Sequence, residues 1–262
     1  MRLRDLFTLH EDGRMISFAQ CAGDVIISRF FEKQLVGTYI DVGANHPIND
    51  SVTKNLYDAG WRGINIEPEA RFFGELESLR KKDINLQIGL SSRDGEAEYF
   101  QVDSNLDLST FDPIKADLLR SQGHSISVHL VKTSTLQSVL RKYKLGSYVD
   151  LIKIDVEGYE IEVLRGIDFD EINFGLMIIE VGDSKERICN FLKLRGYKLI
   201  YFDGLNAWLA PIDFSGQISF DPPSPVLDWY HPYIYLNQIQ KQHQLILDLM
   251  ERSTTKSSTE PH

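Results

Sequence analysis

The chain has little cysteine, and neither of its two cysteines stands in a metal-binding spacing. Cys21 and Cys189 lie far apart in the 262-residue sequence. A small domain stabilised by disulfides needs several cysteines, and a reducing cytoplasm is the simplest setting for a chain with so few. We therefore expect a cytoplasmic protein without a disulfide scaffold.

Long apolar runs and a surplus of basic residues are also lacking. No run reaches the roughly 20 apolar residues that a membrane-spanning helix needs, and the N-terminal residues continue into Glu-Asp-Gly rather than into the apolar core of a signal peptide. The 28 Lys and Arg against 38 Asp and Glu give a formal net charge of −10. Such a balance argues against a protein that grips nucleic acid through its phosphates. We expect neither a membrane span nor a nucleic-acid partner.

Residues 39–45, Tyr-Ile-Asp-Val-Gly-Ala-Asn, are the most informative stretch. A β-branched and aromatic run followed by an acid and a glycine predicts a buried parallel strand that leads into a tight, ligand-binding turn. Asp41 would lie at the carboxyl end of that strand, and Gly43 would let the backbone approach a ligand closely. The turn lacks the further glycines of a dinucleotide fingerprint and the Gly-Lys-Ser/Thr of a phosphate-binding loop, which disfavours those two ligand classes.

A second strand ends on an acid in the same way. Residues 64–66 alternate apolar and polar, and Glu67 follows them just before Pro68. Glu67 comes about 26 positions after Asp41, near the spacing at which the second strand of a dinucleotide-binding half presents a carboxylate to ribose hydroxyls. The pair therefore predicts a site for a nucleoside.

Two later strands, at residues 148–155 and 176–180, repeat this design, and helices are expected between the strands. In a parallel sheet the ends of all four strands would meet at one edge and form an acidic crevice. A hairpin at residues 197–210 closes the sheet. The pattern predicts an α/β fold with a doubly wound, mostly parallel sheet. The four acids at the strand ends are Asp41, Glu67, Asp155 and Glu180.

The flanking regions predict extensions to this core. We expect a helical extension over residues 1–36, a core domain over 37–212, an aromatic and helical extension over 213–252, and a disordered polar tail over 253–262. Polar groups in residues 17–24 are interpreted as caps and solvent-exposed side chains. Trp229 and Tyr230 either pack on the sheet or stack on sugar rings of a substrate. A helix at 235–250 either covers the core or forms a homodimer contact.

Three motifs together resemble the FkbM family of S-adenosylmethionine-dependent methyltransferases. They are Asp-Val-Gly-Ala-Asn at 41–45, Ile-Glu-Pro at 66–68, and Lys-Ile-Asp-Val-Glu-Gly-Tyr-Glu at 153–160. The last is the most specific, and the resemblance extends over residues from about 37 to 182. Most family members carry an Asp where this chain has Gln137. The chain departs from the family pattern at this position, and the polar contact made by that Asp is not expected here.

The resemblance implies a Rossmann-like class I methyltransferase fold with a seven-stranded sheet whose last strand is antiparallel. It also implies that S-adenosyl-L-methionine is the cofactor and that O-methylation, often of sugars or polyketides, is the reaction. By this analogy the site residues divide by the part of the cofactor they face: Asp41, Gly43 and Asn45 at the methionine end, Glu67 at the ribose, and Gly89 and Leu90 near adenine.

Methyl transfer to a hydroxyl benefits from a base that removes the hydroxyl proton. Asp155 is the first candidate, with Glu157 and Lys153 two positions away on either side and able to share its face in an extended chain. His46 is a rival base, because imidazole titrates near neutral pH, or else it only holds the loop before Pro47.

Glu180 is interpreted as a ligand for a substrate hydroxyl or as a partner of Lys153. Alternatively Asp155, Glu157 and Glu180 could hold Mg²⁺ or a similar hard cation that binds the acceptor's oxygens.

The leading hypothesis is a cytoplasmic enzyme that methylates a hydroxyl of a saccharide or glycan precursor. An NAD-dependent oxidoreductase is the first alternative, because it also uses an acid at the position of Glu67. The second is a binding module that keeps the cofactor pocket without the chemistry.

Overall fold

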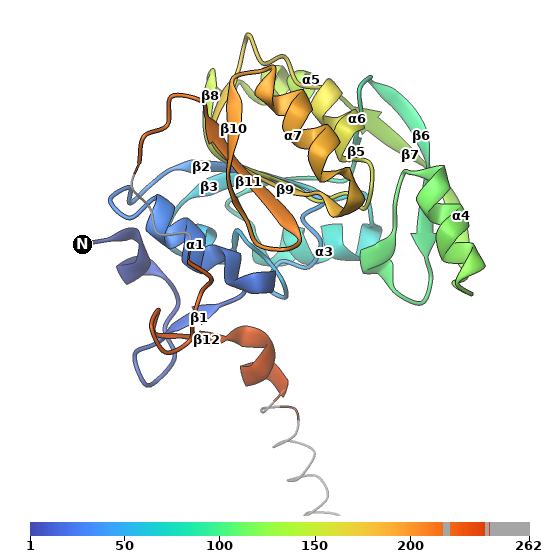
Figure 1. Ribbon diagram of the computed structural model, residues 1–262. Helices are drawn as coiled ribbons and strands as arrows, with labels where there is room; N and C mark the ends of the chain where they lie inside the picture. The colour runs from blue at the N-terminus through green and yellow to red at the C-terminus, as the bar shows by residue number, and fades with distance from the viewer. Residues whose placement is uncertain (217–220, 239–240, 242–262) are drawn as a thin grey trace, which may run out of the picture.

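The computed structural model describes residues 1–216, 221–238 and 241 (Figure 1). Its centre is a seven-stranded sheet with the order β10-β11-β9-β8-β2-β3-β4. Strand β11 is antiparallel to both of its neighbours, and the pairs among β2, β3, β4, β8 and β9 are parallel. The strands are β2 (Thr38–Val42), β3 (Arg62–Ile66), β4 (Ile84–Leu86), β8 (Tyr148–Ile154), β9 (Asn173–Glu180), β10 (Tyr197–Phe202) and β11 (Asn206–Pro211).

This sheet confirms the predicted fold class. The sheet is mostly parallel, and the last of its strands in the sequence is inserted antiparallel between β9 and β10. Together with helices on both faces, this is the Rossmann-like class I methyltransferase architecture.

Helices cover both faces of the sheet (Figure 1). Helices α5, α6 and α7 lie on one face and α1 and α2 on the other. Because successive strand residues point to opposite faces, each central strand contributes side chains to the hydrophobic cores on both sides of the sheet. Ile152 packs with the first group of helices and Leu151 with the second. The helices are α1 (Gly23–Phe30), α2 (Lys54–Asp58), α3 (Ala70–Leu79), α5 (Leu136–Tyr143), α6 (Glu160–Arg165) and α7 (Lys185–Lys193).

A small second sheet is inserted between β4 and α5. It contains β5 (Gly89–Leu90), β6 (Gly95–Val102) and β7 (Ile126–Ser134), in the order β5-β7-β6, and α4 (Pro113–Ser121) connects its two long strands. Residues 84–91, interpreted from the sequence as a third strand and its exit loop, contain two short strands: the chain leaves the main sheet after β4, and β5 pairs with β7.

The N-terminal extension is only partly helical. Two short 3₁₀ helices, Leu3–Leu6 and Gln20–Ala22, flank strand β1 (Met15–Ser17), and α1 follows. Strand β1 pairs in parallel with β12 (Tyr230–Pro232), more than 200 residues later. The helical prediction for residues 1–36 was wrong here, since a partner so distant in the sequence leaves no local signal.

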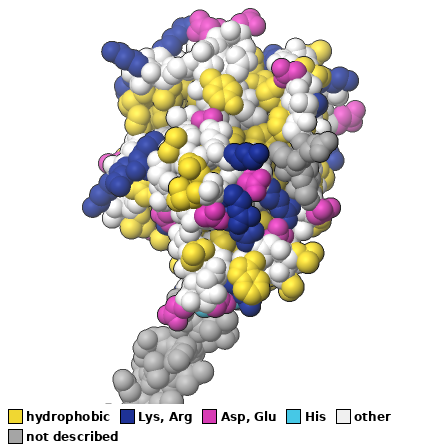
Figure 2. Space-filling view, turned by 90° about the vertical axis from the view of Figure 1, so that its left-hand side faces the viewer, with side chains coloured by type: hydrophobic (Ala, Val, Ile, Leu, Met, Phe, Trp, Pro, Cys, Tyr) yellow, Lys and Arg dark blue, Asp and Glu magenta, His cyan; other side chains and the backbone are white. Residues whose placement is uncertain are grey.

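The C-terminal predictions are described only in part. Residues 233–238 are helical, while most of the helix predicted at 235–250 and all of the tail predicted at 253–262 lie outside the described residues. Within the described ranges, no helix combines the length and the hydropathy of a membrane span. On the face of the molecule drawn in Figure 2, acidic, basic and hydrophobic side chains are interspersed.

Candidate active site

A cavity of about 730 Å³ opens where the parallel strands of the main sheet end. Its volume is in the range of small-molecule binding sites. The predicted convergence is present, because the acids that end four strands all line this cavity. These are Asp41 at the end of β2, Glu67 just after β3, Asp155 just after β8 and Glu180 at the end of β9.

The turn after β2 is fastened to the end of β3. The backbone N–H of Asn45 donates to Glu67 Oε2 at 2.8 Å, and the N–H of Glu69 donates to Glu67 Oε1 at 2.8 Å. Glu67 is buried, and burial raises its pKa to about 7. Both carboxylate oxygens thus already accept one hydrogen bond, and each keeps a second lone pair that a ligand hydroxyl can use.

Gly43 has a different structural role from the one predicted. Its φ is +70°, and a Cβ at this position would lie 1.8 Å from the backbone carbonyl oxygen of Asp155. The close approach that demands glycine is therefore between the turns after β2 and β8, although Gly43 also lines the cavity.

Asp41 lines the cavity, and one of its carboxylate oxygens has no hydrogen-bond partner among the described residues. The Thr53 hydroxyl donates to Asp41 Oδ2 at 2.8 Å. Asp41 Oδ1 is buried and has no hydrogen-bond partner in the described part of the chain; Lys153 Nζ lies 3.7 Å from it. Burial raises the pKa of Asp41. An unpaired buried acceptor is costly, so a ligand with an ammonium group or another N–H donor fits here.

Lys153 contacts both the turn that follows β2, residues 43–45, and Asp155 just after β8. Its ammonium donates to the Gly43 carbonyl oxygen at 2.7 Å and lies 3.3 Å from Asp155 Oδ2. Burial alone would lower the pKa of Lys153, but the carboxylates of Asp155 and Asp41 raise it. The lysine therefore stays charged and acts as a fixed counter-ion.

Asp155 and Glu180 interact as a pair beside this lysine. Burial and the neighbouring Asp155 carboxylate raise the pKa of Glu180, which shares a hydrogen bond with Asp155. Burial alone would raise the pKa of Asp155, but the Lys153 ammonium and the bond to Glu180 lower it. The two carboxyl groups are thus shifted in opposite directions, with the pKa of Glu180 raised and that of Asp155 lowered.

Glu157 completes a group of three carboxylates. Oxygen atoms of Asp155, Glu157 and Glu180 all lie within 4.8 Å of one another, so the structure brings together the residues predicted as metal ligands. Lys115, from helix α4, forms an ion pair with Glu157. Lys115 and Lys153 thus place two positive charges beside this group of carboxylates, where a bound metal ion would otherwise provide the positive charge.

The ring of His46 holds the loop that continues from the turn after β2. Its Nδ1 accepts hydrogen bonds from the backbone N–H groups of Ile48 and Asn49, both at 3.0 Å, and its Nε2 lies 3.4 Å from Glu75 Oε2. Burial lowers the pKa of His46. The Nδ1 lone pair is therefore occupied, and the remaining ring nitrogen faces Glu75.

Gly89 and Leu90 also line the cavity, at the side where the small sheet begins. A Cβ on Gly89 would lie 2.4 Å from the ring of Phe111, so the glycine allows this aromatic wall to form. Asn45 Nδ2 donates to Asp107 Oδ1 at 3.0 Å, which joins the cofactor turn to the loop that follows β6.

The N-terminal extension forms another wall, which the sequence interpretation missed. Ser17 and Phe18 line the cavity, whereas residues 17–24 were expected to cap a helix and face solvent. The buried Asp24 carboxylate holds them, because it accepts hydrogen bonds from the Ser17 hydroxyl at 2.6 Å and from the Phe18 N–H at 2.9 Å. The signal available in the sequence was Asp24, an acid only six positions after the aromatic Phe18.

The C-terminal segment closes the cavity with other aromatic residues than those predicted. Trp229 and Tyr230 are not among the cavity-lining residues of the described chain. Tyr230 is buried on β12, and Trp229 stacks beneath the Arg14 guanidinium, 4.6 Å from it. Tyr233 lines the cavity instead, with its ring 4.9 Å from that of Phe18.

A family model places this arrangement among known proteins. The Methyltransferase FkbM domain matches residues 41–203, more than half of the chain. No curated protein matches the sequence.

Three of the solved structures to which the chain is similar are methyltransferases. The methyltransferase FkbM from Methylobacillus flagellatus KT has 15% identity and a TM-score of 0.42, over 66% of this chain and 43% of that chain. TrmK from M. capricolum, in complex with S-adenosyl-homocysteine, has 9% identity and a TM-score of 0.40, over 86% and 85%. The precorrin-6y C5,15-methyltransferase from Geobacter metallireducens GS-15 has 11% identity and a TM-score of 0.37, over 78% and 91%.

Proposed function

Because the chain belongs to the FkbM methyltransferase family, we propose that it is an enzyme that transfers a methyl group from S-adenosylmethionine to a hydroxyl of a sugar or glycan precursor. One observation carries the proposal. Asp155 and its partner Glu180 lie in the same cavity as the turn formed by residues 41–45, and Lys153 Nζ lies 3.3 Å from Asp155 Oδ2.

The residues around the turn fit this cofactor. The unpaired Asp41 Oδ1 suits the ammonium group of the methionine end, with Gly43 and Asn45 beside it. Glu67 accepts from the ribose hydroxyls, and Gly89 and Leu90 contact the adenine. When bound, S-adenosylmethionine supplies a methyl group on a positively charged sulfur, which an oxygen nucleophile attacks in line.

Asp155 acts on the acceptor. It accepts the proton of the hydroxyl as the new O–C bond forms, since a sugar hydroxyl is a poor nucleophile at neutral pH. Lys153 keeps Asp155 ionised beforehand. Glu180, which holds a proton of its own, donates a hydrogen bond and orients the pair. Glu157, which lines the cavity and is held by Lys115, accepts hydrogen bonds from the acceptor's remaining hydroxyls. His46 is assigned to the loop and not to proton transfer, because its Nδ1 is occupied.

The charge of the cavity favours a neutral acceptor. Among the described residues that line it, eight are acidic and three are basic, Arg71, Lys153 and Lys241. A phosphorylated sugar or a nucleic acid would meet repulsion there, whereas an uncharged polyol would find many hydrogen-bond acceptors. Aromatic side chains at the rim, Phe18 and Tyr233, suit the C–H faces of a sugar ring.

We propose that the reaction proceeds without a metal ion. Lys153 and Lys115 form ion pairs with Asp155 and Glu157, two of the three residues that Mg²⁺ would otherwise bind. Equal turnover in a chelator and in added Mg²⁺ would support this, and loss of turnover in the chelator alone would assign the three carboxylates to a metal.

The first experiment is a calorimetric titration of the whole chain with S-adenosylhomocysteine, with NAD as the control ligand. Saturable binding of the former alone is the expected result. Binding of NAD instead would favour an oxidoreductase, the alternative that shares an acid at Glu67.

Acceptors are then screened with radiolabelled methyl donor, comparing neutral sugars with their phosphorylated forms. Cofactor binding with no transfer to any hydroxyl compound would favour the non-catalytic module.

A further inference from the structure

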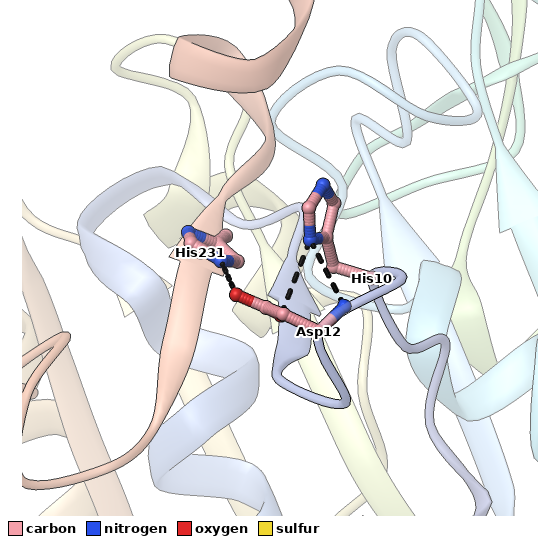
Figure 3. Close-up of side chains that lie close together, drawn as sticks. All are labelled: His10, Asp12 and His231. Carbon is pink, nitrogen blue, oxygen red and sulfur yellow. Dashed lines mark hydrogen bonds and ion pairs between the residues drawn. The ribbon is translucent and has the colours of Figure 1, made fainter.

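A cluster of two histidines and one aspartate lies outside the cavity, where the N-terminal extension meets β12. Asp12 stands between His10 and His231 (Figure 3). We propose that His10, Asp12 and His231 form a binding site for a transition-metal dication such as Zn²⁺, which fastens the N-terminal turn to β12.

The distances suit a metal site that closes by small side-chain movements. His10 Nδ1 lies 3.1 Å from Asp12 Oδ1, and His231 Nε2 lies 2.8 Å from Asp12 Oδ2. Ligand atoms of all three residues lie within 4.8 Å of one another. A tetrahedral ion with bonds of about 2.1 Å separates its ligands by about 3.4 Å, so the contact of His10 would open by about 0.3 Å and that of His231 by about 0.6 Å.

The backbone places the three ligands firmly. Residues 10–14 form a tight turn, in which the N–H of His10 donates to the Arg14 carbonyl at 2.8 Å. The Arg14 N–H donates to Asp12 Oδ1 at 3.1 Å and orients the carboxylate. Across the sheet, His231 pairs in register with Ile16. The strand pairing thus brings a histidine from near the C-terminus against the turn.

The donor set selects the class of ion. Two imidazole nitrogens and one carboxylate are typical ligands of Zn²⁺, Co²⁺ or Ni²⁺, whereas Mg²⁺ and Ca²⁺ prefer oxygen alone. Without an ion, His10 Nδ1 and His231 Nε2 contact the Asp12 carboxylate directly, and His10 Nδ1 also accepts from the Asp12 backbone N–H at 3.5 Å. A bound ion would share Asp12 with Arg14, whose Nε lies 3.3 Å from Oδ2.

The position of the cluster gives the ion a structural effect on the cavity. Strand β12 continues directly into Tyr233, which lines the cavity. The other partner, β1, ends at Ser17, which lines the same cavity. A bound ion would stabilise the pairing of the two strands that carry these walls.

The test titrates the whole chain, first stripped of metal with a chelator, with Zn²⁺ and with Co²⁺. His10→Asn and His231→Asn are the test variants, and His129→Asn, at an exposed position of β7, is the matched control. We expect one Zn²⁺ per chain for the unmodified protein and the control, with affinity at least tenfold weaker in each test variant. Zn²⁺ should raise the melting temperature of the unmodified protein and of the His129→Asn control, but not that of the two test variants. The Co²⁺ absorption bands of imidazole ligands should be lost in both test variants.

A second measurement needs no variant. Diethyl pyrocarbonate modifies exposed histidines, and Zn²⁺ should protect His10 and His231 but not His129, as read by mass spectrometry. Equal Zn²⁺ affinity in the test variants, or unchanged modification of His10 and His231 with Zn²⁺ present, would overturn the site. Binding that survives the loss of both histidines would assign the ion to the carboxylates of the cavity instead.

Discussion

Lys153 Nζ lies 3.3 Å from Asp155 Oδ2, two positions further along the chain where β8 ends. The same ammonium donates to the carbonyl oxygen of Gly43. A single buried cation thus sets the charge of the proposed base and also contacts the cofactor turn. The two functions of the site are joined through this side chain.

Asp155→Asn tests the base. We expect turnover to fall by a factor on the order of 10² to 10⁴, while the Kd for S-adenosylhomocysteine changes little, because the substitution removes a proton acceptor and keeps the shape. The measurement is single-turnover methyl transfer beside calorimetry. Asp170→Asn, at an exposed position, is the matched control. Unchanged turnover in Asp155→Asn would remove the assignment.

His46→Gln distinguishes the rival base from a loop-holding residue. We expect turnover to stay within about tenfold of the unmodified enzyme, since the Nδ1 atom accepts two backbone N–H groups and is not free for the acceptor. The melting temperature should fall by a few degrees, from the loss of about 1 kcal/mol per hydrogen bond. A loss of turnover as large as that of Asp155→Asn, at normal cofactor affinity, would reverse this assignment.

Glu67→Gln tests the ribose contact. We expect the Kd for S-adenosylhomocysteine to rise by about tenfold or more, because hydrogen bonds to a charged acceptor are worth more than those to an amide. In the unmodified protein the affinity should also increase from pH 6 to pH 8, as Glu67 ionises around its pKa of about 7. The variant should lack this increase, and an unchanged affinity at pH 8 would mean that Glu67 does not hold the ribose.

The same variant tests the burial of Glu67 through stability. Its pKa in the folded protein, about 7, exceeds the ordinary value of 4.5. The native state therefore binds the proton more tightly, and its stability falls as the pH rises from about 4.5 to about 7. At pH 8 this cost is at most roughly 3 kcal/mol. Urea unfolding without ligand should show that Glu67→Gln gains stability relative to the unmodified protein between pH 5 and pH 8. If the two proteins differed in free energy of unfolding by the same amount at pH 5 and at pH 8, the raised pKa of Glu67 would be contradicted.

Gly43→Ala tests the packing of the two turns. The new Cβ would meet the Asp155 carbonyl oxygen at 1.8 Å in a backbone with φ of +70°, so we expect a loss of at least about 3 kcal/mol in the free energy of unfolding. Gly74→Ala, in helix α3 with open space around it, should instead gain about 0.5 to 1 kcal/mol. Urea titration separates the two, and equal effects would show that the turns can move apart.

The sequence predicted those parts of the site that depend on strand ends. Asp41, Glu67, Asp155 and Glu180 each close an apolar strand, and parallel strands bring their carboxyl ends to one edge. Lys115 was missed, because the insertion that carries helix α4 has weak periodicity and nothing local indicates that the helix reaches Glu157. Trp229 and Tyr230 were selected because their segment is rich in aromatic residues, yet in the described part of that segment Tyr233 is the aromatic residue that lines the cavity.

What the sequence determined by itself is the α/β class, the alternation of strands and helices, and the acids at the strand ends. These follow from local periodicity and from short motifs. Only the tertiary structure decided the pairing of β1 with β12, the entry of Phe18 and Tyr233 into the cavity wall, and the meeting of His10 with His231. Each of these joins residues far apart in the chain, and a contact between distant segments depends on the packing of everything between them rather than on any local pattern.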